Sequence, residues 1–261
     1  MPAFEAVEGM PYWQDLATTS ALKSTYFYSQ LLGWEISDDG YRVARKEGLP
    51  VAGFIKQLDD PTMTDAWVTY FFTRDLRRDQ GGVEKLGGKV LATADVSLGT
   101  MSLCADPAGA VFGLIEPAGE DQFVAAGEPG TPVWHEYVGF DKARECIDFY
   151  AELFDWEVRA EDGYYLASLD GAPFLGMRDE SAAEEFEGLP GFWETYLGVA
   201  DAEAAARKTG ELGGEVVIQP TEHAFGLLLT VADSTGATVT LCEVAEPTFE
   251  ELNEADSVLD L

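Results

Sequence analysis

Apolar and polar residues alternate near the start of the chain, and a helical pattern follows directly. Residues 12–17 (YWQDLA) alternate in the way of a strand with one buried face. Residues 21–32 then place apolar side chains at helical spacing, with Ser20 in position to cap the helix and Gly33 in position to end it. The pattern therefore begins with a strand and a helix.

More strands and a second helix follow. Short alternating segments bounded by turn residues predict strands. These strands cover residues 41–45, 51–55, 66–73, 100–105 and 111–116. A second helix is expected to end near Leu86, although Gly81 and Gly82 inside it disfavour a helix. The order is a strand, a helix and three strands, followed by the same order again.

The whole pattern then occurs a second time in the chain. The segment FYSQLLGW at residues 27–34 returns as FYAELFDW at 149–156, and LGGKV at 86–90 returns as LGGEV at 212–216. Other matched residues are Trp13 with Trp134, Asp15 with Glu136, Tyr41 with Tyr164, Gly53 with Gly176 and Tyr70 with Tyr196. A repeat of this length is a duplicated domain, since the units of solenoid proteins are far shorter.

The composition changes between and after the two copies. Residues 116–131 are rich in Gly, Ala, Pro and Glu, which is typical of a linker. The last residues are acidic and lack the repeated pattern. We expect an N-terminal domain at 1–120, a linker at 121–130, a C-terminal domain at 131–245 and an acidic tail at 246–261.

The bulk composition is that of a globular protein. Hydrophobic residues make up 46% of the 261 residues and charged residues 25%, and no apolar run approaches the length of a membrane span. The first residues lack the features of a secretory signal, so a cytoplasmic protein is expected. Cys104, Cys146 and Cys242 have no CxxC spacing, which favours reduced, buried thiols over disulfides or a zinc site.

The net charge limits the partners. The chain has 48 acidic and 16 basic residues, a formal net charge of −32. Nucleic acids and anionic membranes repel such a chain, so neither is expected as a partner. The acidic surface also favours solubility.

Several motifs together resemble a known group of proteins. They are the FY pair before LGW, the LGG after the second helix and DPAGAVFGL on the final hairpin. The chain is similar to the vicinal oxygen chelate superfamily, which includes glyoxalases, bleomycin resistance proteins and extradiol dioxygenases, and in particular to tandem glyoxalase-like proteins of actinobacteria. The resemblance implies an α+β fold in which two βαβββ modules per domain form a curved, cupped mixed sheet. It does not fix the reaction.

The resemblance also predicts where metal ligands lie in metal-using members, on the first and last strands of each module. The matching residues here are Trp13, Val68, Gly113, Trp134, Glu194 and Thr240, and residues 51–55 and 174–177 add no acid or imidazole. Glu194 alone is far short of the three or four ligands of a metal site, so neither a metal nor another cofactor is expected. His135 alternates to the opposite face from Trp134, and His223 is expected in a solvated loop.

The same strand faces carry aromatic and acidic residues instead. The candidate ligand-binding residues are Trp13, Asp15, Tyr70, Trp134, Glu136, Glu194 and Tyr196. Aromatic walls with carboxylates suit a small organic ligand, but the aromatic rings could equally fill the cups as core residues. The acids favour a pocket, because an unpaired buried carboxylate is costly. An Arg or Lys partner inside the fold would remove that argument.

Two functions follow from this pattern. The first is metal-independent binding of a hydrophobic or aromatic small molecule. The alternative is a glyoxalase-like lyase or isomerase that uses Asp15, Glu136 or Glu194 as a general base, or a non-standard metal site. The resemblance implies a monomer whose two domains imitate a dimer, with a homodimer as the alternative.

Overall fold

The computed structural model describes residues 3–37, 40–57, 64–119, 123–161, 163–223 and 226–246. The acidic tail predicted at 246–261 lies outside the described residues from residue 247 onward. Among the described residues, the helices are too short and too polar to cross a membrane.

The N-terminal copy forms one sheet of eight strands with two helices. Its elements are β2 (Pro11–Thr18), α1 (Ala21–Leu32), β3 (Glu35–Ile36), β4 (Arg42–Lys46), β5 (Leu49–Lys56), β6 (Ala66–Phe72), α2 (Leu76–Lys85), β7 (Lys89–Val96), β8 (Gly99–Ala105) and β9 (Val111–Pro117). The spatial order is β3-β4-β5-β2-β6-β9-β8-β7. The first strands of the two modules, β2 and β6, pair antiparallel in the middle, and each pairs in parallel with the last strand of its own module.

The C-terminal copy repeats this arrangement. Its elements are β11 (Pro132–Gly139), α3 (Ala143–Phe154), β12 (Glu157–Glu161), β13 (Tyr164–Leu169), β14 (Ala172–Asp179), a 3-10 turn (Glu184–Phe186), β15 (Phe192–Val199), α4 (Ala202–Glu211), β16 (Glu215–His223), β17 (Gly226–Ala232) and β18 (Thr238–Glu243). The order β12-β13-β14-β11-β15-β18-β17-β16 matches that of the first sheet. The predicted α+β fold of two βαβββ modules per copy is confirmed.

The helix ends follow the local sequence. Gly33 ends α1 in the left-handed conformation with φ 70°, which glycine adopts without strain. Ser20 occupies the N-cap position of α1, but its side chain makes no capping hydrogen bond. The second helix, α2, forms despite Gly81 and Gly82, because the carboxylate of Asp75 accepts from the amide of Arg78 at 2.9 Å and caps its first turn.

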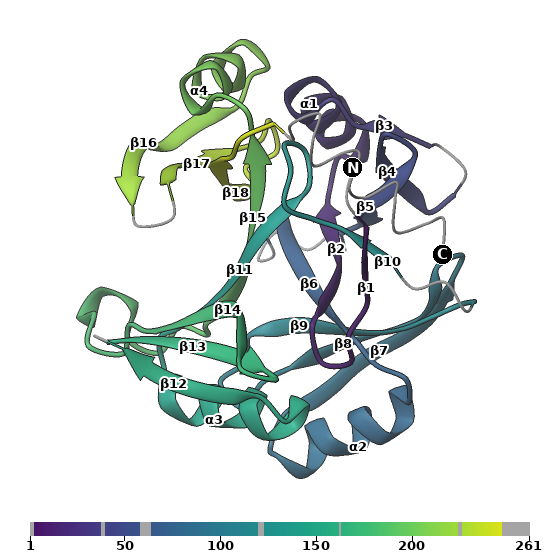
Figure 1. The fold of residues 1–261 in the computed structure, drawn as a ribbon, viewed down its shortest axis with the longest axis vertical. Helices are drawn as coiled ribbons and strands as arrows, with labels where there is room; N and C mark the ends of the chain where they lie inside the picture. Colours follow the sequence, from purple (N-terminus) through teal and green to yellow (C-terminus); the bar gives the residue numbers. More distant parts are fainter. Residues whose placement is uncertain are drawn as a thin grey trace.

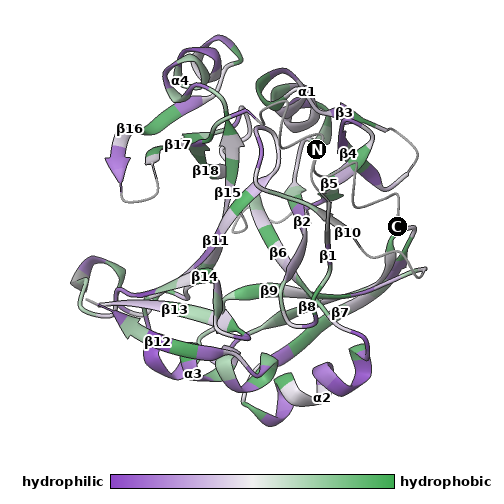
Figure 2. Cartoon of the chain, viewed as in Figure 1, coloured by the Kyte–Doolittle hydropathy of each residue, from purple (hydrophilic) through white to green (hydrophobic). Residues whose placement is uncertain are grey.

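The cores are shared between the two copies. Figure 1 shows α1 beside α4 and α2 beside α3, so each helix pair combines one helix from each copy. One core joins Phe27 and Tyr28 of α1 to Leu197 of β15, and the other joins Phe71 of β6 to Tyr150 of α3. Hydrophobic residues gather on these strands in Figure 2, whereas α2 is largely hydrophilic. The duplicated sheets are therefore one packed unit.

Two tryptophans that follow helices, Trp34 and Trp156, connect the copies further, and both are buried. Trp34 donates through Nε1 to the carbonyl of Gly130 at 2.7 Å, just before the first strand of the second copy. Trp156 donates in the same way to the carbonyl of Gly9 at 2.9 Å, just before the first strand of the first copy. The repeated FY…W segments therefore join the copies as well as sealing each helix.

A small additional sheet was not predicted from the sequence. Strand β1 (Ala3–Glu5) pairs antiparallel with β10 (Phe123–Ala125), which lies inside the predicted linker at 121–130. The chain start and the connection between the copies are thus held together.

Candidate functional site

The face of the N-terminal sheet that points away from the helices carries Trp13, Asp15 and Tyr70, and we call it the N-terminal cup. Tyr41 donates to Oδ1 of Asp15 at 2.5 Å, and Nε1 of Trp13 donates to the same oxygen at 3.0 Å. Trp13 also donates to the hydroxyl of Tyr41 at 2.7 Å. These polar groups satisfy one oxygen of Asp15, while Oδ2 is buried without a hydrogen-bond partner.

The N-terminal cup is closed by its own side chains. Trp13, Asp15 and Tyr70 are all buried, and Trp13 and Tyr70 pack with Met101 and Ile115 in a hydrophobic cluster. Burial raises the pKa of Asp15 to about 6, although the hydrogen bonds from Tyr41 and Trp13 act in the opposite direction. The aromatic residues in this copy fill the cup as core residues, which was one of the two interpretations of the sequence.

The corresponding face of the C-terminal sheet, the C-terminal cup, repeats the cluster and adds charge. Tyr164 donates to Oε2 of Glu136 at 2.7 Å, and Tyr196 donates to Oε1 at 3.3 Å. Trp134 donates to the hydroxyl of Tyr164 at 3.3 Å. The guanidinium of Arg178 binds Oε1 of Glu136 at 2.5 Å. Glu136 therefore has a cationic partner. The argument that an unpaired buried acid favours a pocket does not apply to it.

A second carboxylate lies next to Glu136. Glu136 and Glu194 are direct partners in the β11–β15 ladder, so their side chains share one face. The hydroxyl of Thr240 donates to Oε1 of Glu194 and also hydrogen-bonds with Thr230 at 3.0 Å. Burial raises the pKa of Glu194, and the neighbouring charge of Glu136 adds to this, while Thr240 and Arg178 lower it.

The C-terminal cup reaches the surface, unlike its counterpart. Trp134, Tyr164 and Glu194 are partly exposed, and the side chain of Arg178 is 40% exposed. Arg178 donates through Nε to Glu136 and through Nη1 to Glu180 at 3.2 Å. Among the described residues no group accepts from its Nη2. An accessible guanidinium between two carboxylates and an indole makes this cup the candidate functional site.

The glycines Gly53 and Gly176 make room for both clusters. Each lies directly opposite the cup acid of its copy, Gly53 beside Asp15 and Gly176 beside Glu136. A Cβ atom at Gly53 would overlap Asp15 and the Tyr41 hydroxyl, and one at Gly176 would overlap the hydroxyl of Tyr164. The tyrosine hydroxyl thus reaches the acid only because the residue between them has no side chain.

The structure brings the predicted site residues together within each cup, and it adds four that the sequence interpretation missed. The additional residues are Tyr41, Tyr164, Arg178 and Thr240. The tyrosines had a signal, because Gly-Tyr recurs at matching positions in both copies. Arg178 had none, because the first copy has Ile55 at the matching position. Thr240 occupies a position where the resemblance places a metal ligand, but it was considered there only as a missing ligand.

The residues of the C-terminal cup do not fit the metal centre that this fold implies. The tryptophan indole offers no ligand, Glu136 is already bound to a guanidinium cation, and Glu194 is the remaining carboxylate. In the described part of the chain no three His, Cys, Asp or Glu residues are grouped as metal ligands.

The histidines and cysteines lie where they contribute no metal ligands to the cups. His135 is on the opposite face of β11 from Glu136, as predicted, and its Nδ1 hydrogen-bonds with the hydroxyl of Thr195 at 3.1 Å. His223 is exposed, as predicted, but the predicted loop is wrong, since His223 ends strand β16. The three cysteines are buried and form no disulfide, as expected.

Family models match both copies. Residues 15–115 match a glyoxalase-like domain, and residues 137–241 match the Glyoxalase/Bleomycin resistance protein/Dioxygenase superfamily. Together these matches cover most of both eight-stranded sheets.

Relatives and solved structures agree with these matches. The chain is 30% identical to the anthracycline biosynthesis protein DnrV of Streptomyces peucetius, over 91% of this chain and 94% of that protein. It is 28% identical to the putative glyoxylase CFP32 of Mycobacterium tuberculosis, over 88% and 93%. The Mn(II)-bound glyoxalase from Novosphingobium aromaticivorans has the same fold, with TM-score 0.62 and 15% identity over 93% of this chain and 88% of that chain. The 2,3-dioxygenase LapB from Pseudomonas sp. KL28 follows at TM-score 0.60 and 13% identity, over 92% and 94%.

Proposed function

Because the chain belongs to the Glyoxalase/Bleomycin resistance protein/Dioxygenase superfamily, we propose that it binds a small aromatic molecule in the C-terminal cup without a metal ion. The observation that carries the proposal is the Glu136–Arg178 pair at 2.5 Å, which occupies the cup of this copy with a fixed charge pair. A guanidinium held in this way orients a ligand through hydrogen bonds and needs no Lewis acid.

The cup residues define the class of ligand. The partly exposed indole of Trp134 offers a flat apolar surface, and Nη2 of Arg178 offers a donor. These groups match an aromatic ring system that carries a carbonyl oxygen. The relative from Streptomyces peucetius is named for anthracycline biosynthesis. Catalysis is not required by this arrangement.

Calorimetric titration of the full chain with chromone, a neutral bicyclic aromatic ketone, tests the proposal. We expect one chromone per chain, and a double variant Glu136→Gln/Arg178→Met should weaken binding by at least about tenfold, the loss expected for one hydrogen bond to a charged donor. Asp15→Asn in the closed N-terminal cup is the matched control and should leave binding unchanged. Equal binding by both variants, or no binding to chromone and related ketones, would contradict the proposal.

Elemental analysis tests the metal-independent part separately. Protein purified without chelators is expected to hold far less than one manganese, iron, nickel or zinc per chain. Stoichiometric metal that disappears in Glu194→Gln would show that Glu194 belongs to a metal site and would overturn this part.

A second candidate function has its own support in Glu194. Burial raises the pKa of Glu194, so its ionised carboxylate is a stronger base than that of an ordinary glutamate, and it lies directly opposite Glu136 in the sheet. The chain could then remove a proton from the carbon next to a carbonyl group, with Glu194 as the base.

Hydrogen exchange distinguishes catalysis from binding. A saturated ketone such as 4-chromanone, incubated in D₂O, should lose its exchangeable C–H signals in the proton NMR spectrum faster with the protein than without it. Glu194→Gln should abolish the difference while chromone still binds. If exchange is not accelerated at all, the chain is a binding protein for this class of compound.

A further inference from the structure

A further cavity lies between the two copies, at the start of β11. Its volume is about 350 Å³, within the range of sites that hold small molecules. Its walls come from the end of β1 and the two residues after it, the start of β2, Ala126 after β10, the start of β11 and Phe174 of β14. Of the candidate site residues Trp134 alone lines it, so the cavity borders the C-terminal cup without including Glu136, Arg178 or Glu194.

The walls are mainly apolar. Met10, Pro11, Val133 and Phe174 contribute aliphatic and aromatic surface. Glu5 is an exposed residue at this cavity, and within the described part of the chain no Lys or Arg lines it. An anion would meet this carboxylate and the net charge of −32 without a compensating cation. A neutral apolar molecule is the occupant that such walls favour.

One polar group on the wall can orient that molecule. His135 lines the cavity and uses Nδ1 for its hydrogen bond with Thr195 at 3.1 Å. Thr195 in turn hydrogen-bonds with Thr69 of the other copy at 3.1 Å. Among the described residues no partner is bonded to Nε2 of His135. The hydrogen bond to Thr195 fixes the orientation of the ring. Its second nitrogen, Nε2, remains available to hydrogen-bond a ligand.

Burial keeps this imidazole neutral. It lowers the pKa of His135 to about 3, so the ring carries no charge at neutral pH. In a neutral imidazole, Nε2 either donates or accepts, depending on which nitrogen carries the proton. A hydroxyl group satisfies both cases, because it can donate or accept.

We infer that this cavity binds a small neutral aromatic molecule with a hydroxyl group, held by a hydrogen bond to Nε2 of His135. The first copy gives a comparison, since Gln14 occupies the position that matches His135 and bonds the carbonyl of Val51 at 3.2 Å. The inference does not depend on the function proposed for the C-terminal cup.

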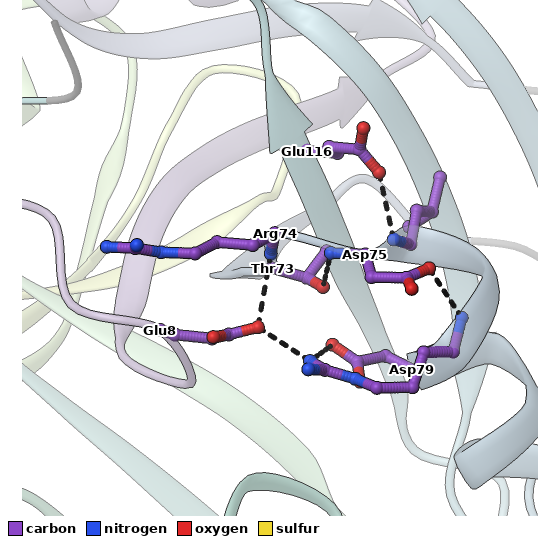
Figure 3. Close-up of polar contacts among 8 residues, drawn as sticks. Glu8, Thr73, Arg74, Asp75, Asp79 and Glu116 are labelled. Carbon is purple, nitrogen blue, oxygen red and sulfur yellow. Dashed lines mark hydrogen bonds and ion pairs between the residues drawn. The ribbon is translucent and has the colours of Figure 1, made fainter. Parts of the chain in front are cut away.

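The segment that closes the cavity is fixed in place by Glu8. Its carboxylate accepts from the amide of Arg74 at 3.2 Å and from the guanidinium of Arg78 at 2.6 Å, as Figure 3 shows beside Asp79. These bonds tie the connection between β1 and β2 to the start of α2. The cavity wall made by residues 5–7 is thereby anchored at its end.

Titration of the full chain with 1-naphthol tests the inference. We expect one naphthol per chain, with a change in tryptophan fluorescence because Trp134 lines the cavity. Ala126→Phe fills the cavity from the connection between the copies and should weaken binding at least tenfold. His135→Gln introduces the residue that the first copy has at this position, and it should weaken binding about tenfold while naphthalene, which has no hydroxyl group, binds as before.

Two controls separate this site from the cup. The Glu136→Gln/Arg178→Met variant should bind 1-naphthol normally, and 1-naphthoate should not bind to the unaltered protein. The inference is overturned if 1-naphthol does not bind, if Ala126→Phe binds it with unchanged affinity, or if only the cup variant loses it. Circular dichroism of each variant confirms that the protein is folded before binding is compared.

Discussion

Glu136 and Glu194 lie directly opposite each other in the β11–β15 ladder, yet the first binds Arg178 and the second accepts a hydrogen bond from Thr240. Two like charges in such a pair destabilise a sheet unless each has its own partner. In the N-terminal copy the matching pair is Asp15 and Val68, and no such conflict arises. The two cups therefore differ in charge, since the C-terminal cup holds two acids and an arginine where the N-terminal cup holds one acid.

The Glu136–Arg178 pair should be asymmetric in its contribution to stability. Arg178→Met leaves the buried carboxylate of Glu136 without a cation and should cost about 3 kcal/mol, whereas Glu136→Gln leaves a guanidinium that reaches solvent and should cost about 1 kcal/mol. The double variant should recover part of the larger loss. Urea unfolding of the four proteins measures these differences. Equal losses from the two single changes would contradict this account of burial.

The stability of the N-terminal cup should depend on pH through Asp15. Its pKa of about 6 lies above that of an unfolded aspartate, so the folded state holds the proton more tightly and loses stability as pH rises from about 4 to about 6. Asp15→Asn removes this dependence. The variant should be more stable than the unaltered protein by about 2 to 3 kcal/mol at pH 8 and nearly equal at pH 4.

Urea unfolding of both proteins at the two pH values checks this prediction. The difference between them isolates Asp15 from the many other acidic groups. A difference of the same size at pH 4 and pH 8 would show that the proton on Asp15 is not responsible.

The stability of the protein should require that positions 53 and 176 have no side chain. Alanine at either position places a Cβ atom where a tyrosine hydroxyl meets the cup acid, so each change should destabilise the protein by about 1 to 3 kcal/mol. Gly81→Ala is the matched control. Gly81 lies within α2, where an added Cβ atom would meet open space, and the change should stabilise the protein by about 0.5 to 1 kcal/mol. Thermal unfolding distinguishes the two directions.

The architecture was predictable from the sequence because the duplicated chain contains the pattern of each module twice. Alternating segments, glycine stops and the FY…W pattern define each module in both copies, so an ambiguous segment in one is clarified by its match in the other. Even α2, which contains two glycines, is supported by the alanine-rich α4 at the matching place. The β1–β10 pair was missed because neither strand has a repeated counterpart in the sequence.

Only part of the site was predictable, because the contacts between its residues depend on the register of neighbouring strands. The acids follow from alternation along one strand, but their partners come from other strands. Gly176 is the direct strand partner of Glu136, and Arg178 lies two residues further along the same strand. The Arg178 side chain therefore lies on the same face as Glu136 and passes over the glycine to reach it. That contact depends on the parallel β11–β14 register, which a single sequence does not give. Whether the cups bind a ligand remains a prediction for the experiments above.

The two copies should unfold as one unit rather than as two domains. Both cores combine residues from the two copies, and Tyr137 of β11 donates to Oδ2 of Asp106, in the last hairpin of the other copy, at 2.7 Å. Tyr137→Phe removes this bond and leaves a buried carboxylate oxygen poorly satisfied, which should cost about 1 to 3 kcal/mol. The loss should appear in a single calorimetric transition whose van't Hoff and calorimetric enthalpies agree.

Tyr26→Phe is the matched control for this prediction, because Tyr26 is an exposed residue of α1. It should leave the transition temperature nearly unchanged. Two separate transitions in the unaltered protein, with Tyr137→Phe shifting only one of them, would show that the copies unfold independently. A single transition that shifts in Tyr137→Phe means instead that the two copies unfold together. The shared cores then define the cooperative unit, because neither sheet buries its helix-covered face without the other.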